Sequence, residues 1–174
     1  MSRAKSRAEL LQELEHAMRR ASAQGTIYAS VVADLVGISS SDMDCMDFLN
    51  LEGRMTAGRL AELTGLTTGA ITGVVDRMEK AGLVHRERDA GDRRKVFIVA
   101  AEESMARLGR LYQPLQRAMQ KQSGRYSDAE LRLLLRYASE SYQSVLEATT
   151  QLKAMVEAQP KAKPAGVKKP SRVP

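Results

Sequence analysis

Arginines are the residues of this sequence whose type and spacing most clearly predict a function, because their guanidinium groups can bind phosphates. They cluster between residues 77 and 94, around a short polar segment that contains a glycine. Such a local cluster is typical of a surface that binds phosphates, so it predicts contact with a nucleic acid. For Arg77 and Arg86 a structural ion pair is the alternative, because acidic residues lie close in the sequence at positions 76 and 79. The candidates for phosphate contacts are Arg54, Arg59, Arg77, Arg86 and Arg88.

Groups for catalysis or metal binding are scarce. The chain has one cysteine, Cys45, and two histidines, His16 and His85, too few for a zinc cluster or an internal disulfide. It also lacks a glycine loop that cradles phosphate and a nucleophile motif. We therefore expect no enzyme, no catalytic residue, no metal and no cofactor. Acidic neighbours such as Asp44 disfavour the thiolate of Cys45, so a buried, inert thiol is favoured over an oxidant sensor.

Positive charge is distributed unevenly along the 174 residues. Of the formal net charge of +6, five charges belong to residues 160–174, which contain no acid, and residues 1–159 carry only +1. DNA affinity of the folded part must then come from local clusters. The composition of residues 159–174 predicts a disordered basic tail, either with a role in DNA binding or without one.

Composition favours a soluble protein that is mainly α-helical. Hydrophobic residues make up 43% of the chain, enough for a core, while aromatic residues make up only 4%. The basic start runs into an amphipathic helix without the apolar core of a signal peptide, and no run of about 18 apolar residues occurs. We expect a cytoplasmic protein with no membrane partner.

Long helices are predicted before and after the arginine cluster. From residue 8 to residue 35 apolar residues recur every three or four positions, as one helix or as two that meet at Gly25. Gly37 ends this segment, and Ser40 or Ser41 can cap a shorter helix that follows.

The helical period returns after residue 102, where Pro114 should introduce a kink. Ser127 and Glu130 form a capping box that opens a last helix of about 28 residues, roughly 42 Å long. A helix of this length extends beyond a small domain. Its apolar stripe needs a partner, for which a second copy of the chain is the simplest choice.

Between these long helices, two short helices are predicted on either side of a tight corner at Gly65. Thr56 and Thr67 are candidate N-caps, and Gly82 is a candidate stop for the second helix. A helix-turn-helix places its second helix in a DNA major groove. The exposed threonines expected there, which offer weaker base discrimination than arginine, are Thr67, Thr68 and Thr72.

Two strands with a basic turn are predicted directly after this helix pair. Residues 83–88 and 95–100 are rich in β-forming residues and flank the turn DAGD. A basic hairpin beside a helix-turn-helix can reach the DNA backbone or the minor groove. The sequence therefore predicts a mainly α fold: a winged helix-turn-helix with a small β-hairpin wing and long terminal helices that form a dimer.

This order of elements resembles the MarR family of winged-helix transcriptional regulators. The similarity covers roughly residues 8–157. Its most specific motifs are VVDRMEKAGLVHRER, at the end of the second short helix and in the first strand, and DAGDRR in the turn of the hairpin. The resemblance implies a homodimer on double-stranded DNA, with half-sites of a pseudo-palindrome about 10 base pairs apart. It assigns Arg94 to the minor groove with Asp92 as its paired carboxylate, both on one face of a strand, and adds Arg93 to the DNA contacts.

The domain organisation expected from the resemblance has four parts. Residues 1–37 form an N-terminal dimerisation segment, and residues 38–101 form the DNA-binding domain. Residues 102–158 supply the C-terminal dimerisation helices, and residues 159–174 form the basic tail.

The function expected is that of a sequence-specific transcriptional regulator, a ligand- or stress-responsive repressor. The alternative is a nucleoid-associated protein with weak sequence specificity, which the lysine-rich tail and the threonines of the second short helix would suit. The resemblance implies a small aromatic or phenolic acid as effector, bound where the dimer helices meet the DNA-binding domain. The residues expected nearest to that junction are His16, Met43 and Met46.

Overall fold

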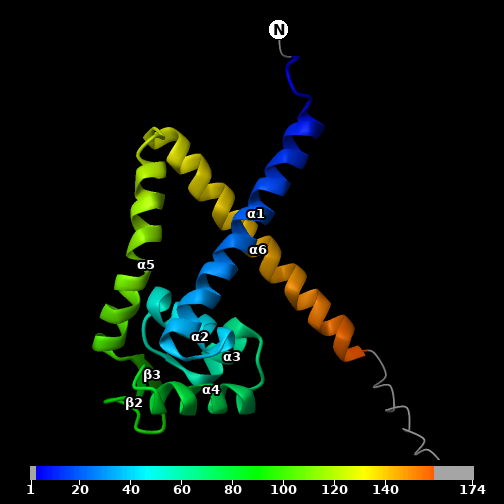
Figure 1. Cartoon of the computed structure of the whole chain (residues 1–174). Helices are drawn as coiled ribbons and strands as arrows, with labels where there is room; N and C mark the ends of the chain where they lie inside the picture. Colours follow the sequence, from blue (N-terminus) through cyan, green and yellow to red (C-terminus); the bar gives the residue numbers. More distant parts are fainter. Residues whose placement is uncertain (1–2, 159–174) are drawn as a thin grey trace, which may run out of the picture. The chain divides into compact units, whose positions relative to one another are not determined.

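The computed structural model describes residues 3–158 of the chain and confirms a mainly α fold with a small antiparallel sheet. Figure 1 shows the order of the elements. The helices are α1 (Arg7–Val36), α2 (Ser40–Glu52), α3 (Ala57–Thr64), α4 (Thr68–Lys80), α5 (Glu102–Ser123) and α6 (Asp128–Ala158). The strands are β1 (Met55–Thr56), β2 (Val84–Arg88) and β3 (Val96–Ala100).

The chain divides into two compact units, Met1–Gln116 and Arg117–Pro174. The first unit contains the hydrophobic core, to which α1 contributes only its last turns, with α2, α3, α4, the sheet and the start of α5. Methionines fill much of this core, which suits irregular gaps between short helices. The largest fully buried apolar side chains are Met43, Met46, Leu60, Ile71 and Met78.

The helix ends largely confirm the signals in the sequence. Gly37 and Gly65 end α1 and α3 in the left-handed conformation, with φ of +82° and +70°. Thr56 caps α3 through the N–H of Arg59. Helix α1 runs through Gly25 without a break, so the first predicted segment is one helix.

The cap expected for α2 at Ser40 or Ser41 is wrong. Helix α2 is capped by Ser39, whose hydroxyl accepts the N–H of Asp42, while the Asp42 carboxylate accepts the N–H of Ser39. This reciprocal pair needs an acid three residues after the cap, which excludes Ser40, whose third following residue is Met43. Ser41 meets the condition through Asp44, but the helix begins one residue before it, at Ser40. Ser40 and Ser41 therefore lie inside the helix.

The sheet has three strands in the order β1-β3-β2, one more than the sequence predicted. Strand β1 pairs with the edge of β3 that faces away from β2, with Met55 opposite Ile98. Strands β2 and β3 form the predicted hairpin, in register from Val84 opposite Ala100 to Arg88 opposite Val96. Both hairpin strands are one residue shorter than predicted, and the helix-turn-helix leads directly into them.

Helix α5 continues through Pro114. Proline leaves the carbonyl four residues earlier, at Arg110, without its helical N–H partner. At the next carbonyl the Tyr28 hydroxyl of α1 donates a hydrogen bond to Leu111 O at 2.8 Å. The Tyr28 ring also packs on Tyr112, with 5.5 Å between ring centroids. These contacts join the end of α1 to α5 within the first unit.

The second unit contains α6, which opens as predicted with a capping box between Ser127 and Glu130. None of the residues described on α6 is buried, although an apolar stripe follows its length. The exposed apolar residues of this stripe include Leu131, Leu134, Leu135, Tyr142, Val145, Leu146, Leu152 and Met155.

Within residues 3–158 no helix is long and apolar enough to cross a membrane. The basic tail predicted for residues 159–174 lies outside the described residues.

Candidate nucleic-acid interface

Helix α4 presents small polar residues on its exposed N-terminal half. Thr67 is its N-cap, and its hydroxyl accepts the N–H of Ala70. The Thr72 hydroxyl donates to the carbonyl of Thr68, which leaves its oxygen able to accept a further bond. The buried face of α4, which includes Ile71 and Met78, packs into the core, so the threonines lie on the opposite, open side.

Arg77 of α4 is held by a residue that the sequence did not indicate. Its Nη2 lies 2.6 Å from Asp42 Oδ1 and its Nε lies 3.3 Å from Asp42 Oδ2. The Asp42 carboxylate is buried, with only 3% of its side chain exposed, whereas 55% of the Arg77 side chain is exposed. Burial raises the pKa of Asp42, but hydrogen bonds from Arg77 and Ser39 outweigh it, so the pKa is lowered. The pair fixes α4 to the start of α2.

Arg86 of β2 forms the ion pairs that the sequence offered as one alternative. Its Nη2 lies 2.6 Å from Asp76 Oδ1, and its Nη1 contacts Glu79. The backbone N–H of Arg86 also donates to Glu79 Oε1 at 3.3 Å. Both acids belong to α4, so this guanidinium fastens the wing to the second helix of the helix-turn-helix.

Arg54 and Arg59 are also ion-paired. Arg54 lies 2.6 Å from Glu87 of β2, and its guanidinium stacks 4.6 Å from the centre of the Phe97 ring. Arg59 at the start of α3 contacts Glu52 at 3.4 Å and Glu62 at 3.2 Å. About half of each arginine side chain is exposed, so both keep donors on the surface.

Two aspartates shape the turn between β2 and β3. The Asp89 carboxylate accepts the N–H groups of Gly91 and Asp92 at 3.0 and 2.9 Å. The Asp92 carboxylate then accepts the Arg94 N–H at 3.1 Å and its Nε at 3.0 Å. These bonds from Arg94 lower the pKa of Asp92, which keeps it ionised.

The pair between Asp92 and Arg94 is present, but the strand geometry expected for it is wrong. Both residues lie in the turn, before β3 begins at Val96. The Asp92 carboxylate accepts the backbone N–H of Arg94, two residues later, and this hydrogen bond brings the two side chains together. The alternating directions of side chains along a strand play no part. The Arg94 side chain points outward, with 91% of it exposed.

Further cations lie on the same hairpin. Arg88 lies at the end of β2, and Arg93 and Lys95 lie in the turn. All three side chains are exposed, and none of them has an ion-pair partner within residues 3–158. Lys95 was absent from the candidates, although it lies beside the predicted basic turn. Asp42 was missed as well, because its contact with Arg77 spans 35 residues. Asp89 was also missed, although its contacts are local and an aspartate that opens a turn commonly accepts the N–H two residues later.

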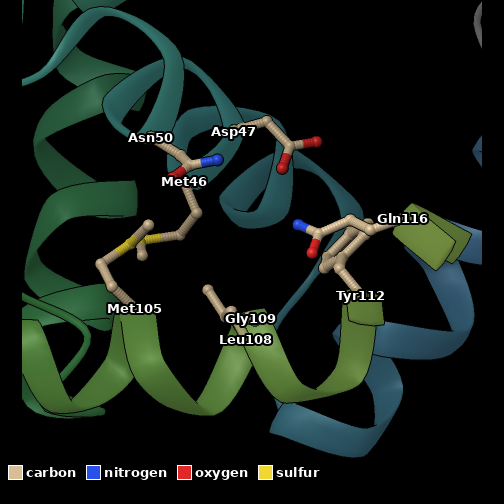
Figure 2. Close-up of a pocket in the computed structure, with 8 residues that line it drawn as sticks. All are labelled: Met46, Asp47, Asn50, Met105, Leu108, Gly109, Tyr112 and Gln116. Atoms are coloured by element: carbon tan, nitrogen blue, oxygen red, sulfur yellow. The ribbon is translucent and has the colours of Figure 1, made fainter. Parts of the chain in front are cut away.

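The three residues expected near an effector lie in different places. His16 is exposed on α1, and Met43 and Met46 are buried on α2. Met46 lines a cavity of about 190 Å³ between α2 and α5, shown in Figure 2, whereas Met43 lines a second cavity with residues of α1. His16 lines neither cavity.

Cys45 is fully buried on α2. Burial raises the pKa of its thiol to about 11, with smaller contributions from Asp42 and Asp44. The structure confirms the predicted burial of Cys45, and burial raises the pKa of the thiol more than the acidic neighbours do. A raised pKa disfavours the thiolate, which is the reactive form. No group of three potential metal ligands occurs in the part of the chain that the structure describes.

Comparison with known proteins places this arrangement in a family. A model of the MarR family matches residues 36–95. The chain is 35% identical over 153 residues to an uncharacterized HTH-type transcriptional regulator of Bacillus subtilis strain 168, YcgE, covering 88% of this chain and 99% of that protein.

Solved structures share the fold. A MarR family protein from Bacillus stearothermophilus is 25% identical, with a TM-score of 0.60 over 81% of this chain and 99% of that one. NadR in complex with 4-hydroxyphenylacetate is 20% identical, with a TM-score of 0.53 over 80% of this chain and 94% of that one. These relatives do not favour the alternative of a nucleoid-associated protein. The chain therefore belongs to the MarR family of winged helix-turn-helix proteins and is a DNA-binding transcriptional regulator.

Proposed function

We propose that this regulator is a repressor that binds a pseudo-palindromic operator as a homodimer. The observation that supports this most is the pairing of two exposed surfaces within the first unit. Helix α4 presents Thr68 and Thr72, and the adjoining hairpin presents unpaired cations around Arg94. Small residues suit close approach of a helix to base edges, and cations suit the backbone and minor groove.

The contacts divide by element. Thr68 and Thr72 contact base edges in the major groove, while Thr67 mainly caps the helix. Arg93 and Arg94 enter the minor groove, with Asp92 orienting the guanidinium of Arg94. Because direct readout by threonine is sparse, groove shape contributes to the choice of site.

The remaining arginines contact phosphates from the edges of this surface. Arg88 is free to do so, whereas four others first hold the domain together through ion pairs. Exposed ion pairs contribute only about 0–1 kcal/mol, so a phosphate can compete for the guanidinium groups of Arg54 and Arg59. The pair of Arg77 with the buried Asp42 is stronger, so Arg77 contacts a phosphate only through the donors that this pair leaves exposed. The four ion-paired candidates are Arg54, Arg59, Arg77 and Arg86.

Binding-site selection on genomic DNA tests the operator. The selected site should be bound about a thousandfold or more tightly than random DNA of equal length at physiological salt. Added protein should reduce transcription in vitro from a promoter that contains the site. Equal affinity for selected and random DNA would contradict the proposal and support weakly specific binding.

The dimer is supported by apolar residues that the single chain leaves exposed on its terminal helices. On α1 these include Leu10, Leu14 and Met18, and α6 has the stripe described above. Leu146→Asp places a charge in that stripe and should yield a monomer in sedimentation, with loss of operator binding. The control Ser144→Asp, whose neighbours one turn away on α6 are Glu140 and Ala148 rather than residues of that stripe, should remain dimeric. A full-length chain that is monomeric at micromolar concentration would contradict the dimer.

We also propose that a small aromatic or phenolic molecule acts as effector in the cavity between α2 and α5. NadR, which shares the fold, was solved with 4-hydroxyphenylacetate. Helix α2 contributes Met46 to this cavity and, one turn earlier, Asp42 to the ion pair with Arg77 of α4. A molecule that displaces α2 therefore alters the placement of α4, which lowers operator affinity.

A further inference from the structure

The cavities that border α2 have an unusual charge balance. Three of them are lined by Asp47, and two of these three are also lined by Asp44. No lysine, arginine or histidine lines any of the three. Whatever enters these cavities meets negative charge without a compensating cation.

Asp44 and Asp47 stand without a partner in the part of the chain that the structure describes. Asp44 and Asp47 form no ion pair and no side-chain hydrogen bond within residues 3–158, although Asp42 on the same helix forms both. Burial raises the pKa of Asp47, with a further contribution from Asp44 one turn away, and burial raises that of Asp44. Asp44 is exposed and Asp47 is partly buried, so a positive group that approaches Asp47 in the cavity would favour its ionised form.

The cavity between α2 and α5 combines this carboxylate with an apolar floor. Figure 2 shows Asp47 and Asn50 from α2 on one side and Gln116 from α5 on the other. The apolar part of the lining is Met46, Met105, Leu108 and the ring of Tyr112. Methionines adapt to ligands of irregular shape, and an aromatic face next to a carboxylate is suited to an ammonium group.

Tyr112 adds a second polar feature. Its hydroxyl is buried and has no hydrogen-bond partner within the described residues. A buried hydroxyl without a partner costs free energy. A bound molecule can recover this cost if it accepts a hydrogen bond from the hydroxyl or donates one to its oxygen. The lining therefore offers a carboxylate, a hydroxyl and two amides, but no group that would neutralise an acid.

We propose that the effector of this cavity is a small organic cation, an aromatic amine whose ammonium group pairs with Asp47 while its ring packs on Met46 and Leu108. The proposal rests on the proposed function of the cavity as the effector site. It differs from the aromatic acid that the family resemblance implies. A carboxylate placed here would face Asp47 at short range with no guanidinium or ammonium to hold it.

Three probes of similar size test the sign of the charge: phenethylamine, 2-phenylethanol and phenylacetate. Calorimetry on the full chain should show phenethylamine binding at least about tenfold more tightly than the other two, the size of one charge-assisted hydrogen bond. Asp47→Asn should remove this preference. The matched control Asp34→Asn, an exposed residue of α1 that lines none of these cavities, should retain it.

Gln116→Lys provides a second variant that works in the opposite direction. The added ammonium group should raise the affinity for phenylacetate and lower that for phenethylamine. Because Gln116 lies at the rim shown in Figure 2, this variant tests the charge of the same cavity if Asp47→Asn alters the fold.

The results answer two questions separately: whether the cavity prefers a cation, and whether a molecule bound there changes operator affinity. If phenylacetate binds most tightly to the unmodified chain, or if none of the probes binds, the inference is overturned. If phenethylamine binds with the expected preference but operator affinity does not change, the inference holds and the effector role in the proposed function fails.

Discussion

The arginines of the DNA-binding unit differ in what holds them, and this determines what their removal will do. Arg77 and Arg86 join elements of the fold, through Asp42 of α2 and the acids of α4 respectively. Among residues 3–158, Arg94 instead pairs only with its neighbour Asp92 in the turn, and almost all of its side chain is exposed. Substitution at Arg94 therefore separates DNA binding from stability.

Arg94→Ala should weaken operator binding by about 1–3 kcal/mol, since it removes a guanidinium from the narrow minor groove. The thermal transition and the oligomeric state should stay unchanged, because the lost contact is exposed. Fluorescence anisotropy with operator DNA and a thermal melt measure both effects. Arg19→Ala on the exposed face of α1 is the control for loss of one positive charge.

Asp92→Ala should weaken operator binding less than Arg94→Ala, because the arginine remains but is no longer oriented. The double variant should bind like Arg94→Ala alone if the carboxylate acts only through that arginine. Operator binding by Arg94→Ala equal to that of the unmodified chain would show that the wing does not enter the groove.

At the pair between Asp42 and Arg77, the two partners should not be equivalent. Arg77→Ala leaves a buried carboxylate without its cation, which should lower the free energy of unfolding by about 3–5 kcal/mol. Asp42→Asn leaves a half-exposed arginine that can turn to water, so its cost should be nearer 1–2 kcal/mol. Urea unfolding of the two variants measures the difference, and equal costs would contradict the assignment of Asp42 as the buried partner.

The same pair predicts a dependence of stability on pH. The pKa of Asp42 is lowered in the folded chain, so its contribution is fully present above the unfolded value of about 3.9 and is lost as the pH falls through the lower folded value. Below about pH 4 the unmodified chain should therefore lose more of its thermal stability than Asp42→Asn does. Parallel slopes for the two proteins would exclude this carboxylate as a source of acid sensitivity.

The sequence predicted these side-chain contacts only where the partners are close in the chain. Asp76 and Glu79 lie within ten residues of Arg86, on the adjoining helix, and the pairing was one of two interpretations. Asp42 is 35 residues from Arg77, and its contact depends on how α2 packs against α4. No local sequence pattern identifies Asp42 as the partner of Arg77, because several other acidic residues are also separated from Arg77 by some tens of residues.

At the level of elements, the sequence predicted most of the fold because each boundary has a local chemical cause. Glycines at positions 37 and 65 and threonines at positions 56 and 67 mark helix ends in the structure as in the sequence. Strand β1 was missed, since two residues form no periodic pattern and only pairing with β3 defines it. The cap at Ser39 was missed because three serines in a row make local propensity ambiguous.

Two adjacent threonines at the start of α4 should respond differently to substitution. Thr67→Ala removes the N-cap bond to Ala70 and should cost about 1 kcal/mol of stability. Thr68→Ala removes a hydroxyl that faces outward, so it should change which bases are preferred and leave the thermal transition almost unchanged. Thermal melts and site selection on both variants measure this contrast. A change of base preference without loss of stability in Thr67→Ala would reverse the two roles.

For the molecule as a whole, charge separates specific contact from general attraction. Residues 1–159 carry a formal charge of only +1, so the cations of the hairpin act locally, while residues 160–174 carry five positive charges. Attraction to phosphates depends on released counterions and therefore on salt, whereas base preference does not. The two parts of the chain should thus affect different measurements.

Removal of residues 160–174 should flatten the salt dependence of DNA binding while leaving operator preference intact. Each neutralised phosphate contributes about 0.9 to the slope of log affinity against log salt, so five cations account for a change of at most about 4.5. Anisotropy titrations with selected and random DNA at several salt concentrations measure slope and preference together. A chain of full length with the five cations replaced by glutamine is the control, and it should behave like the truncated chain if charge rather than length matters. An unchanged slope in both proteins would show that this segment makes no contact with DNA.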